Sequence, residues 1–159
     1  MLPVALLNSL EGVKGFNRKA FEEVHASGEQ ITSVRINQDK NKTIDGQWSM
    51  INGQSLKYSP LTIHSNIPWC PHGFYLTERP SFTFDPLFHA GAYYVQEASS
   101  MFLWHVLQQT VGNNTQKKVL DVCAAPGGKS TLLSSYFTDG LVVSNEVIKS
   151  RAAILTENI

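Results

Sequence analysis

A short apolar strand that runs directly into a glycine turn constrains this chain more than any other feature. Residues 118–120, Lys-Val-Leu, read as the strand, and residues 121–130, Asp-Val-Cys-Ala-Ala-Pro-Gly-Gly-Lys-Ser, read as a tight turn that opens a helix. Alanine and glycine let a ligand approach the backbone closely, and Gly127 or Gly128 can take the positive φ that other residues resist. Because the free N–H groups of a helix start point at the same spot, the sequence predicts a site for a nucleotide-like ligand.

The tail of this turn, Gly128-Lys129-Ser130, also looks like the end of a phosphate-binding P-loop. In that hypothesis the chain is a nucleotide hydrolase, with Lys129 and Ser130 on the phosphates. The P-loop pattern requires a glycine five positions before Gly128, and this sequence has Cys123 there. Pro126 also stiffens a loop that would otherwise wrap phosphate with successive N–H groups. A Rossmann-like unit is therefore favoured, although no dinucleotide-type G-x-G-x-x-G occurs.

A second apolar strand supports the Rossmann-like order. Residues 141–145 read Leu-Val-Val-Ser-Asn, and Glu146 follows them. This acidic residue lies about 20 residues past the glycines, where a carboxylate can accept hydrogen bonds from both hydroxyls of a ribose. The predicted ligand therefore carries an unphosphorylated ribose.

The run from Asp121 to Lys129 resembles the first cofactor motif of the RNA cytosine-C5 methyltransferases of the Nol1/Nop2/Sun family, D-x-C-A-A-P-G-G-K, at every fixed position. Other stretches that resemble the family are residues 33–37, 94–101, 145–146 with Arg151 and Asn158, and 67–70 followed by Gly73-Phe74. Together they cover nearly the whole chain. The Ile-Pro-Trp-Cys segment at 67–70 is similar to the bacterial ribosomal RNA members of the family.

The resemblance implies an enzyme that transfers a methyl group from S-adenosylmethionine to C5 of cytosine in RNA, with ribosomal RNA the first choice and transfer RNA the second. The residues that it implies around the cofactor are Cys123, Ala124, Ala125, Pro126, Gly127, Gly128, Lys129 and Glu146. Asp121 is expected to brace this loop through N–H groups. Lys129 either contacts the cofactor or an RNA phosphate, or is a charged residue in the first turn of a solvent-facing helix.

Catalysis in this family is implied to need two cysteines, one that adds to C6 and one that helps to release the product, each in a Pro-Cys or Thr-Cys motif beyond the cofactor loop. Neither motif occurs in these 159 residues. We therefore assign no catalytic residue and expect this chain to be the truncated front portion of the enzyme, inactive alone. The alternative is a non-catalytic RNA-binding adaptor with a methyltransferase-like fold.

The two cysteines, Cys70 and Cys123, are expected to pack as small apolar residues. Their spacing gives neither a disulfide framework nor a zinc site, so a reducing cytoplasm fits the chain. No metal is expected, because His64, His72 and His89 lack the spacing of metal ligands. No membrane contact is expected either, since no segment approaches the roughly 20 apolar residues of a membrane span.

An α/β fold in two parts is expected: a small N-terminal α+β domain over residues 1–90, then the start of a Rossmann-like methyltransferase domain over residues 91–159. By the resemblance the first domain helps to grip RNA, although the chain has zero net charge and no overall basic footprint. The strands at 119–122 and 141–143 read as interior parallel strands that need neighbours on both sides. Exposed sheet edges are therefore expected, with pairing to a second copy.

The expected helices span residues 2–10, 17–26, 97–110 and 149–158, and the expected strands span residues 31–37, 48–51, 74–76 and 93–95. Asn17 is a candidate N-cap and Gly28 a candidate stop for the second helix. In the third helix Met101, Val106 and Leu107 should face a core.

Two groups of polar residues keep two interpretations each. Gln96, Glu97 and Ser99 either belong to a family element beside the active site or cap the helix that follows them. Arg35 and Asn37 either position RNA and brace a domain interface, as the resemblance implies, or make ordinary hydrogen bonds at a strand end.

Overall fold

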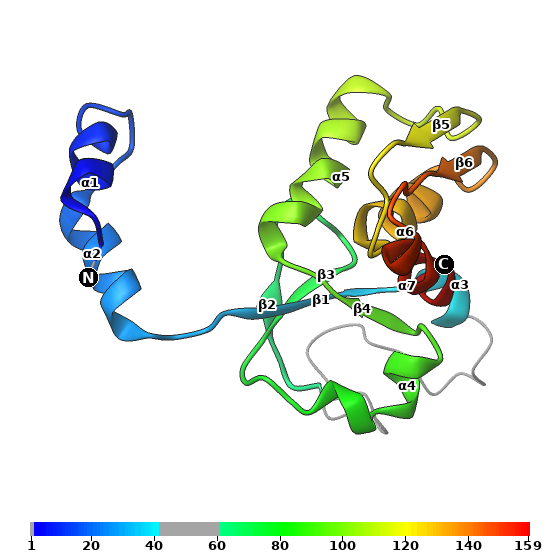
Figure 1. The fold of residues 1–159 in the computed structure, drawn as a ribbon, viewed down its shortest axis with the longest axis horizontal. Helices are drawn as coiled ribbons and strands as arrows, with labels where there is room; N and C mark the ends of the chain where they lie inside the picture. The colour runs from blue at the N-terminus through cyan, green and yellow to red at the C-terminus, as the bar shows by residue number, and fades with distance from the viewer. Residues whose placement is uncertain (1, 42–60) are drawn as a thin grey trace. The chain divides into compact units, whose positions relative to one another are not determined.

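The computed structural model describes residues 2–41 and 61–159 of the chain. It divides into two compact units, Met1–Ile31 and Thr32–Ile159, which are drawn in Figure 1. The predicted strand at 48–51 lies outside the described residues. The predicted domain boundary near residue 90 stays a prediction. No helix within the described ranges is long and apolar enough to cross a membrane.

The first unit holds two helices, α1 (Val4–Leu10) and α2 (Arg18–Ser27). The side chain of Asn17 accepts a hydrogen bond of 3.0 Å from the backbone N–H of Ala20, which confirms Asn17 as the N-cap of α2. Gly28 ends the helix with φ of 66°, in the left-handed region where glycine meets no steric penalty. Both ends of α2 are therefore set by local sequence.

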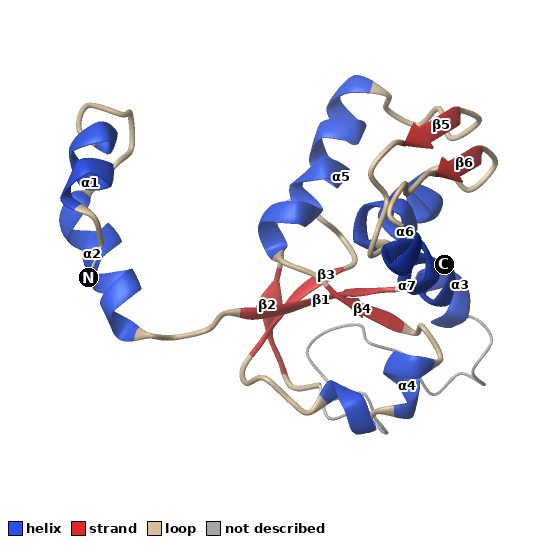
Figure 2. Cartoon of the chain, in the orientation of Figure 1, coloured by secondary structure: helices blue, strands red, loops and turns tan. Residues whose placement is uncertain are grey.

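The second unit begins with a four-stranded antiparallel sheet in the order β2-β3-β1-β4 (Figure 2). The strands are β1 (Thr32–Ile36), β2 (Ile63–Asn66), β3 (Gly73–Leu76) and β4 (Tyr93–Val95). β1 confirms the strand expected over residues 31–37, and all five of its residues are buried, the polar ones included. A central strand that is covered on both faces has no side that faces solvent.

One face of this sheet packs on an apolar cluster built from Val34, Ile36, Leu61, Leu76, Phe82 and Tyr93. Short elements complete that side: α3 (Gln38–Asn41), a 3-10 turn (Phe82–Phe84) and α4 (Pro86–His89). Asp85 caps α4 by accepting from the N–H of Leu87 at 3.0 Å, and it accepts the Tyr93 hydroxyl at 2.5 Å. Burial, followed by this carboxylate, raises the pKa of Tyr93, which stays a neutral donor.

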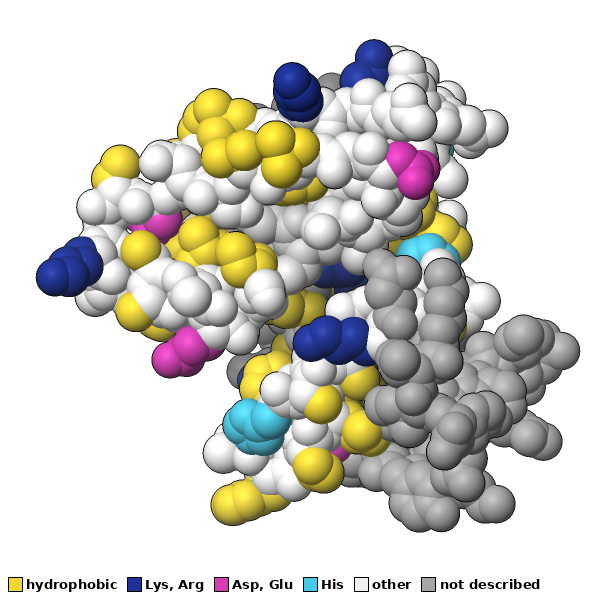
Figure 3. Space-filling view, turned by 90° about the vertical axis from the view of Figure 1, so that its right-hand side faces the viewer, with side chains coloured by type: hydrophobic (Ala, Val, Ile, Leu, Met, Phe, Trp, Pro, Cys, Tyr) yellow, Lys and Arg dark blue, Asp and Glu magenta, His cyan; other side chains and the backbone are white. Residues whose placement is uncertain are grey.

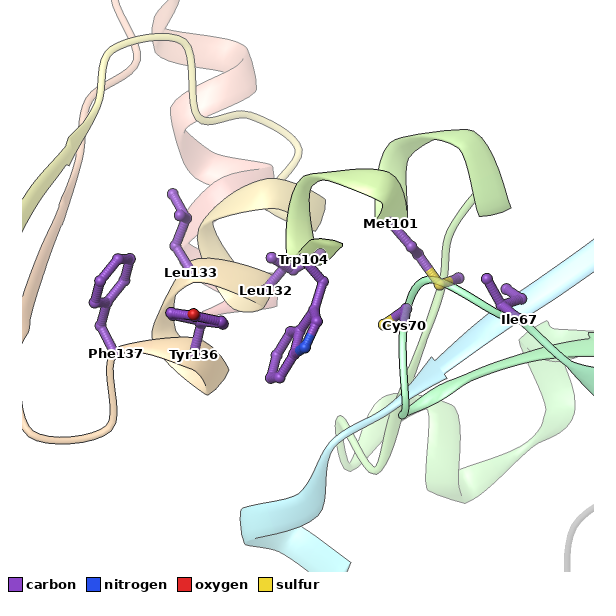
Figure 4. Packing of buried hydrophobic residues seen from close by; sticks show 8 residues of the cluster. All are labelled: Ile67, Cys70, Met101, Trp104, Leu132, Leu133, Tyr136 and Phe137. Atoms are coloured by element: carbon purple, nitrogen blue, oxygen red, sulfur yellow. The ribbon is translucent and has the colours of Figure 1, made fainter. Parts of the chain in front are cut away.

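The larger core lies between α5 (Ala98–Thr110), α6 (Gly128–Tyr136) and the segment before β3. Figure 4 shows its eight buried side chains, which are Ile67, Cys70, Met101, Trp104, Leu132, Leu133, Tyr136 and Phe137. Met101 faces this core as predicted, and Leu107 packs against it. Val106 is 40% exposed and was predicted wrongly, because it lies five positions, or about 140°, around the helix from Met101.

The chain then forms a parallel pair, β5 (Lys118–Asp121) and β6 (Leu141–Ser144), with α6 between them in sequence and α7 (Lys149–Asn158) after them. Val119 and Val142, paired in register, pack against the core. Their neighbours Leu120 and Val143 are exposed. Figure 3 views the molecule from the right-hand side of Figure 1. It shows hydrophobic side chains gathered at the height at which Figure 1 draws β5 and β6. Pairing with a second copy stays a prediction.

Candidate functional site

The glycine turn occupies the loop between the end of β5 and the start of α6. Gly127 is the N-cap of α6 and has φ of 117°, so the positive φ predicted for one of the two glycines falls on Gly127. Its N–H donates to the carbonyl of Ala124 at 2.8 Å, which closes the turn. The Ala125–Pro126 peptide bond is cis. The backbone of the loop is therefore shaped by the residues that the motif specifies.

Asp121 braces the turn from its strand side, as predicted. Its Oδ1 accepts from the N–H of Cys123 at 3.3 Å, and its Oδ2 accepts from the hydroxyl of Ser130 at 2.8 Å. Ser130 is 2% exposed. The hydroxyl that a P-loop would direct at a phosphate-bound metal is instead inside the fold, bonded to Asp121. This geometry is inconsistent with the nucleotide-hydrolase hypothesis.

Two side chains of α7 hold the carbonyl groups of the same loop. Arg151 Nη2 donates to the carbonyl of Ala125 at 2.7 Å, and Asn158 Nδ2 donates to that of Pro126 at 2.8 Å. Leu155 packs on Ala124 and Ala125. The buried residue of α7 therefore packs against the loop. Because residues of α7 bind these carbonyl groups, the loop is held in place by side chains that are not part of the motif.

Gln96 and Arg35 fix the start of α6 from the opposite direction. Gln96 Nε2 donates to the carbonyl of Gly128 at 3.0 Å, and Gln96 Oε1 accepts from Arg35 Nε at 3.0 Å. Arg35 Nη2 reaches the hydroxyl of Thr131 on α6 at 2.6 Å. The interpretation that Gln96 caps α5 is wrong, because its side chain bonds Arg35 and the carbonyl of Gly128. Arg35 does more than bond at the end of its own strand, because it braces β1 against α6.

Gly128 sits where these groups approach most closely. A Cβ atom on Gly128 would lie 3.2 Å from Tyr94 Cε1 and 3.3 Å from Gln96 Nε2, which is tighter than ordinary van der Waals contact. A side chain on Gly128 would therefore have to displace Tyr94 or Gln96 slightly, whereas Gly127 is favoured by its positive φ. Nothing in the sequence distinguishes these two roles.

Glu146 follows β6 and lies beside the glycine turn. Its Oε1 accepts from the N–H of Ile148 at 3.0 Å, and its Oε2 lies 3.5 Å from Arg151 Nη1. The hydrogen bond from Ile148 first, and then the charge of Arg151, lower the pKa of Glu146, so the carboxylate is ionised at neutral pH. Because Arg151 also binds the carbonyl of Ala125, this one side chain connects the acid to the loop.

Seven of the eight residues predicted around the cofactor form one continuous segment, residues 123–129, and the eighth, Glu146, is connected to it through Arg151. Ala124, Ala125 and Gly127 are buried, whereas Cys123, Pro126 and Lys129 are exposed. The packing role expected for Cys123 is therefore wrong, because the alanines fill the space under Leu155. The same expectation for Cys70 is confirmed, since Cys70 is fully buried. Lys129 is exposed in the first turn of α6, where it can meet a ligand or solvent.

Metal ligation has no support in the described part of the chain, where no three His, Cys, Asp or Glu side chains converge. A cavity of about 520 Å³ lies elsewhere, among residues of β1, β4, α4, α6 and α7, and none of the eight predicted residues lines it. The glycine turn and this cavity are therefore separate features.

Comparison with known proteins identifies the family. Residues 2–98 match the family described as the N-terminal domain of 16S rRNA methyltransferase RsmF, and residues 108–159 match 16S rRNA methyltransferase RsmB/F. This chain belongs to the RsmF family. Because the first match covers more than half of the chain, the membership rests on the N-terminal part as well as on the glycine turn.

Curated relatives of the RsmF family agree. The ribosomal RNA small subunit methyltransferase F of Shewanella loihica is 33% identical over 131 residues, which are 80% of this chain and 26% of the relative. Those of Psychromonas ingrahamii and Escherichia coli K12 are 40% and 38% identical over 58% of this chain and 20% of their own length. The chain thus spans about a fifth to a quarter of the curated relatives that it matches.

A solved structure supports the fold. The crystal structure of PH0851 superposes with a TM-score of 0.70 over 98% of this chain and 33% of that chain, at 21% identity. The likeness confirms the expected fold class, an α+β N-terminal part followed by the start of a Rossmann-like methyltransferase domain. Methyltransferases of this family use S-adenosylmethionine as the methyl donor.

Proposed function

We propose that this chain supplies the cofactor loop and an RNA-gripping N-terminal part of an enzyme that transfers the methyl group of S-adenosylmethionine to C5 of cytosine in ribosomal RNA. One observation carries the proposal: the ionised Glu146 at the end of β6 is held beside the glycine turn through Arg151. Ribosomal RNA as the substrate also implies a cytoplasmic enzyme.

The residues of the turn fit S-adenosylmethionine. Glu146 offers the acceptor oxygens that an unphosphorylated ribose requires, since each carboxylate oxygen has a lone pair beyond its present partner. Ala124, Ala125 and Gly127 lie against α7, whereas Cys123, Pro126 and Lys129 are exposed, so the amino-acid end of the cofactor is proposed to approach the exposed side of the turn. S-adenosylmethionine supplies an electrophilic methyl group, and the residues here bind and orient its carrier.

The chemistry at cytosine needs a nucleophile that this chain does not offer in a suitable place. C5 becomes electron-rich enough to accept a methyl group only after a thiolate adds to C6. Cys70 is fully buried, and burial raises the pKa of its thiol. Cys123 belongs to the cofactor turn. We therefore infer that the chain alone binds cofactor without catalysing methyl transfer.

Calorimetric titration of S-adenosylmethionine tests the cofactor site. Binding to the chain is expected to weaken at least tenfold in Glu146→Ala, which corresponds to about 1.4 kcal/mol. Glu78→Ala is the matched control, because Glu78 is an exposed acid on the loop after β3 and is not part of the turn. Equal affinities in all three proteins would remove Glu146 from the site. Stronger binding of ATP with magnesium than of S-adenosylhomocysteine would revive the hydrolase hypothesis.

The target atom is tested separately with the protein expressed from the complete gene. Ribosomal RNA that carries tritium at C5 of cytidine should release tritium as methyl groups are incorporated, because substitution at C5 displaces its hydrogen. Methyl incorporation without tritium release would move the target to another atom. RNA binding with neither event would favour the adaptor.

A further inference from the structure

The cavity of about 520 Å³ in the second unit has a basic wall. Arg35, Lys40 and His89 line it, together with the hydroxyl residues Tyr94 and Ser134, and Glu157 is the acid among its described lining residues. Figure 3 shows lysine or arginine side chains, in dark blue, near the centre of the view. The lining is therefore richer in cations and donors than in acids.

Arg35 is the unusual member of this wall. It is 2% exposed, and its three nitrogens donate to neutral acceptors, which are Gln96 Oε1 at 3.0 Å, Thr131 Oγ1 at 2.6 Å and Ser135 Oγ at 3.3 Å. Burial lowers its pKa to about 10, so the guanidinium is charged at neutral pH. Among the described residues no carboxylate pairs with it. A buried charge without a counter-ion is costly, and an anion beside it would offset that cost.

The remaining donors of the guanidinium suit an oxyanion. Arginine has five N–H groups, and the three bonds of Arg35 leave two. The fork of a guanidinium matches the spacing of phosphate oxygens. Lys40 contributes an ammonium at the same cavity, where its Nζ donates to the carbonyl of Ala90 at 2.8 Å and a Cβ on Gly91 would lie 2.7 Å from it. Gly91 thus leaves room for the lysine head.

We propose that this cavity is an anion site that takes a phosphate group of the RNA strand, with Arg35 as the counter-charge at its wall. The RNA assignment rests on the proposed function, whereas the affinity for phosphate does not. The site is distinct from the cofactor turn, because the two share none of their residues. Filling it would join RNA binding to the brace that holds the start of α6, since Arg35 lines the cavity and also donates to Gln96, which in turn donates to the carbonyl of Gly128.

Ser134→Glu tests the cavity without touching the bonds of Arg35. Ser134 is an exposed residue of α6 that lines the cavity, so a glutamate there places a carboxylate where the phosphate is proposed to sit. Gln108→Glu is the matched control, since it adds the same charge at an exposed position of α5 outside the cavity. Inorganic phosphate, measured by calorimetry and by the shift in melting temperature against chloride of equal ionic strength, is the probe.

Phosphate is expected to bind and stabilise the wild-type chain and Gln108→Glu, and to do neither in Ser134→Glu. Without phosphate, Ser134→Glu is expected to melt at a higher temperature than the wild type, because it adds a carboxylate to the cavity lined by Arg35, which has no carboxylate partner in the described ranges. A melting temperature above wild type also excludes misfolding as the cause of lost binding. Equal effects of phosphate on all three proteins would overturn the site.

Titration with a short single-stranded RNA tests whether the site takes a phosphate group of RNA or only free inorganic phosphate. The slope of log affinity against log salt should fall by about one in Ser134→Glu relative to Gln108→Glu. If phosphate binding is lost but the RNA slope is unchanged, the RNA assignment is wrong. Titration of S-adenosylmethionine into Ser134→Glu should match the wild type, so failure of the cofactor site and failure of this site give different results.

Discussion

The hydroxyl of Ser130 donates a 2.8 Å hydrogen bond to Oδ2 of Asp121, so the first turn of α6 is fastened to the end of β5. The same carboxylate accepts the N–H of Cys123 through its other oxygen. One acid therefore spans the glycine turn from inside. This explains why a sequence that ends in Gly-Lys-Ser does not present its serine to a ligand.

Removing this hydroxyl should destabilise the turn. In Ser130→Ala, Oδ2 of Asp121 loses the hydrogen bond that the buried Ser130 hydroxyl donates. A hydrogen bond to a charged group contributes about 1.5–3 kcal/mol to the free energy of unfolding. We expect the urea midpoint to fall by the corresponding amount and the affinity for S-adenosylmethionine to fall with it. Ser150→Ala, an exposed serine of α7, is the control and should change neither. A midpoint like that of the wild type would mean that the bond is not formed in solution.

The ion pair of Glu146 predicts a pH dependence. Its pKa lies below the ordinary value of 4.5, so the folded state favours the carboxylate. The stability that this group contributes is present above about pH 4.5 and is lost as the pH falls through the lowered pKa. The difference in urea midpoint between the wild type and Glu146→Gln should therefore be largest at neutral pH and shrink in acid. A difference that grows in acid would contradict the assigned partners, Ile148 and Arg151.

The two cysteines should react very differently with a thiol reagent. Cys123 is exposed on the glycine turn, whereas Cys70 is fully buried and burial raises the pKa of its thiol. Iodoacetamide should modify Cys123 in the native chain and both cysteines in urea, as mass spectrometry of peptides would show. S-adenosylmethionine should slow the reaction at Cys123 if it binds the turn. Native labelling of Cys70 would contradict the core packing.

Gly140, which precedes β6, should not tolerate a side chain. A Cβ there would lie 2.4 Å from the carbonyl oxygen of Lys117 and 2.8 Å from that of Thr115, and backbone atoms cannot rotate away. Gly140→Ala should lower the free energy of unfolding by about 1–3 kcal/mol or more, as overpacking does. Asn114→Ala, at an exposed position of the loop before β5, should be near neutral in the same urea titration. Equal stability of the two variants would show that the loop shifts freely.

The elements that local sequence specifies were predicted within one or two residues. Asn17 and Gly28 bound α2 through their own cap geometry, and Asp121 to Ser130 formed the expected strand, turn and helix. β2 was missed because it is held by its pairing with β3, and α4 was missed although Asp85 and Pro86 are local signals for the start of a helix. The strand at β1 was predicted, but the burial of its polar side chains depends on packing against both faces of the sheet, which the sequence does not record.

The sequence alone determined the conformation of the glycine turn, since a motif of glycines, alanines and one acid acts through backbone conformation and local hydrogen bonds. Tertiary structure decided what surrounds that turn. Arg35 lies 96 residues before Thr131 and meets it at 2.6 Å, and Gln96 joins Arg35 to Gly128 across the sheet and helix. Hydrogen bonds between such distant residues leave no periodic pattern in a chain. They depend on which faces the packed strands and helices turn toward one another, and that is fixed only when the whole fold forms.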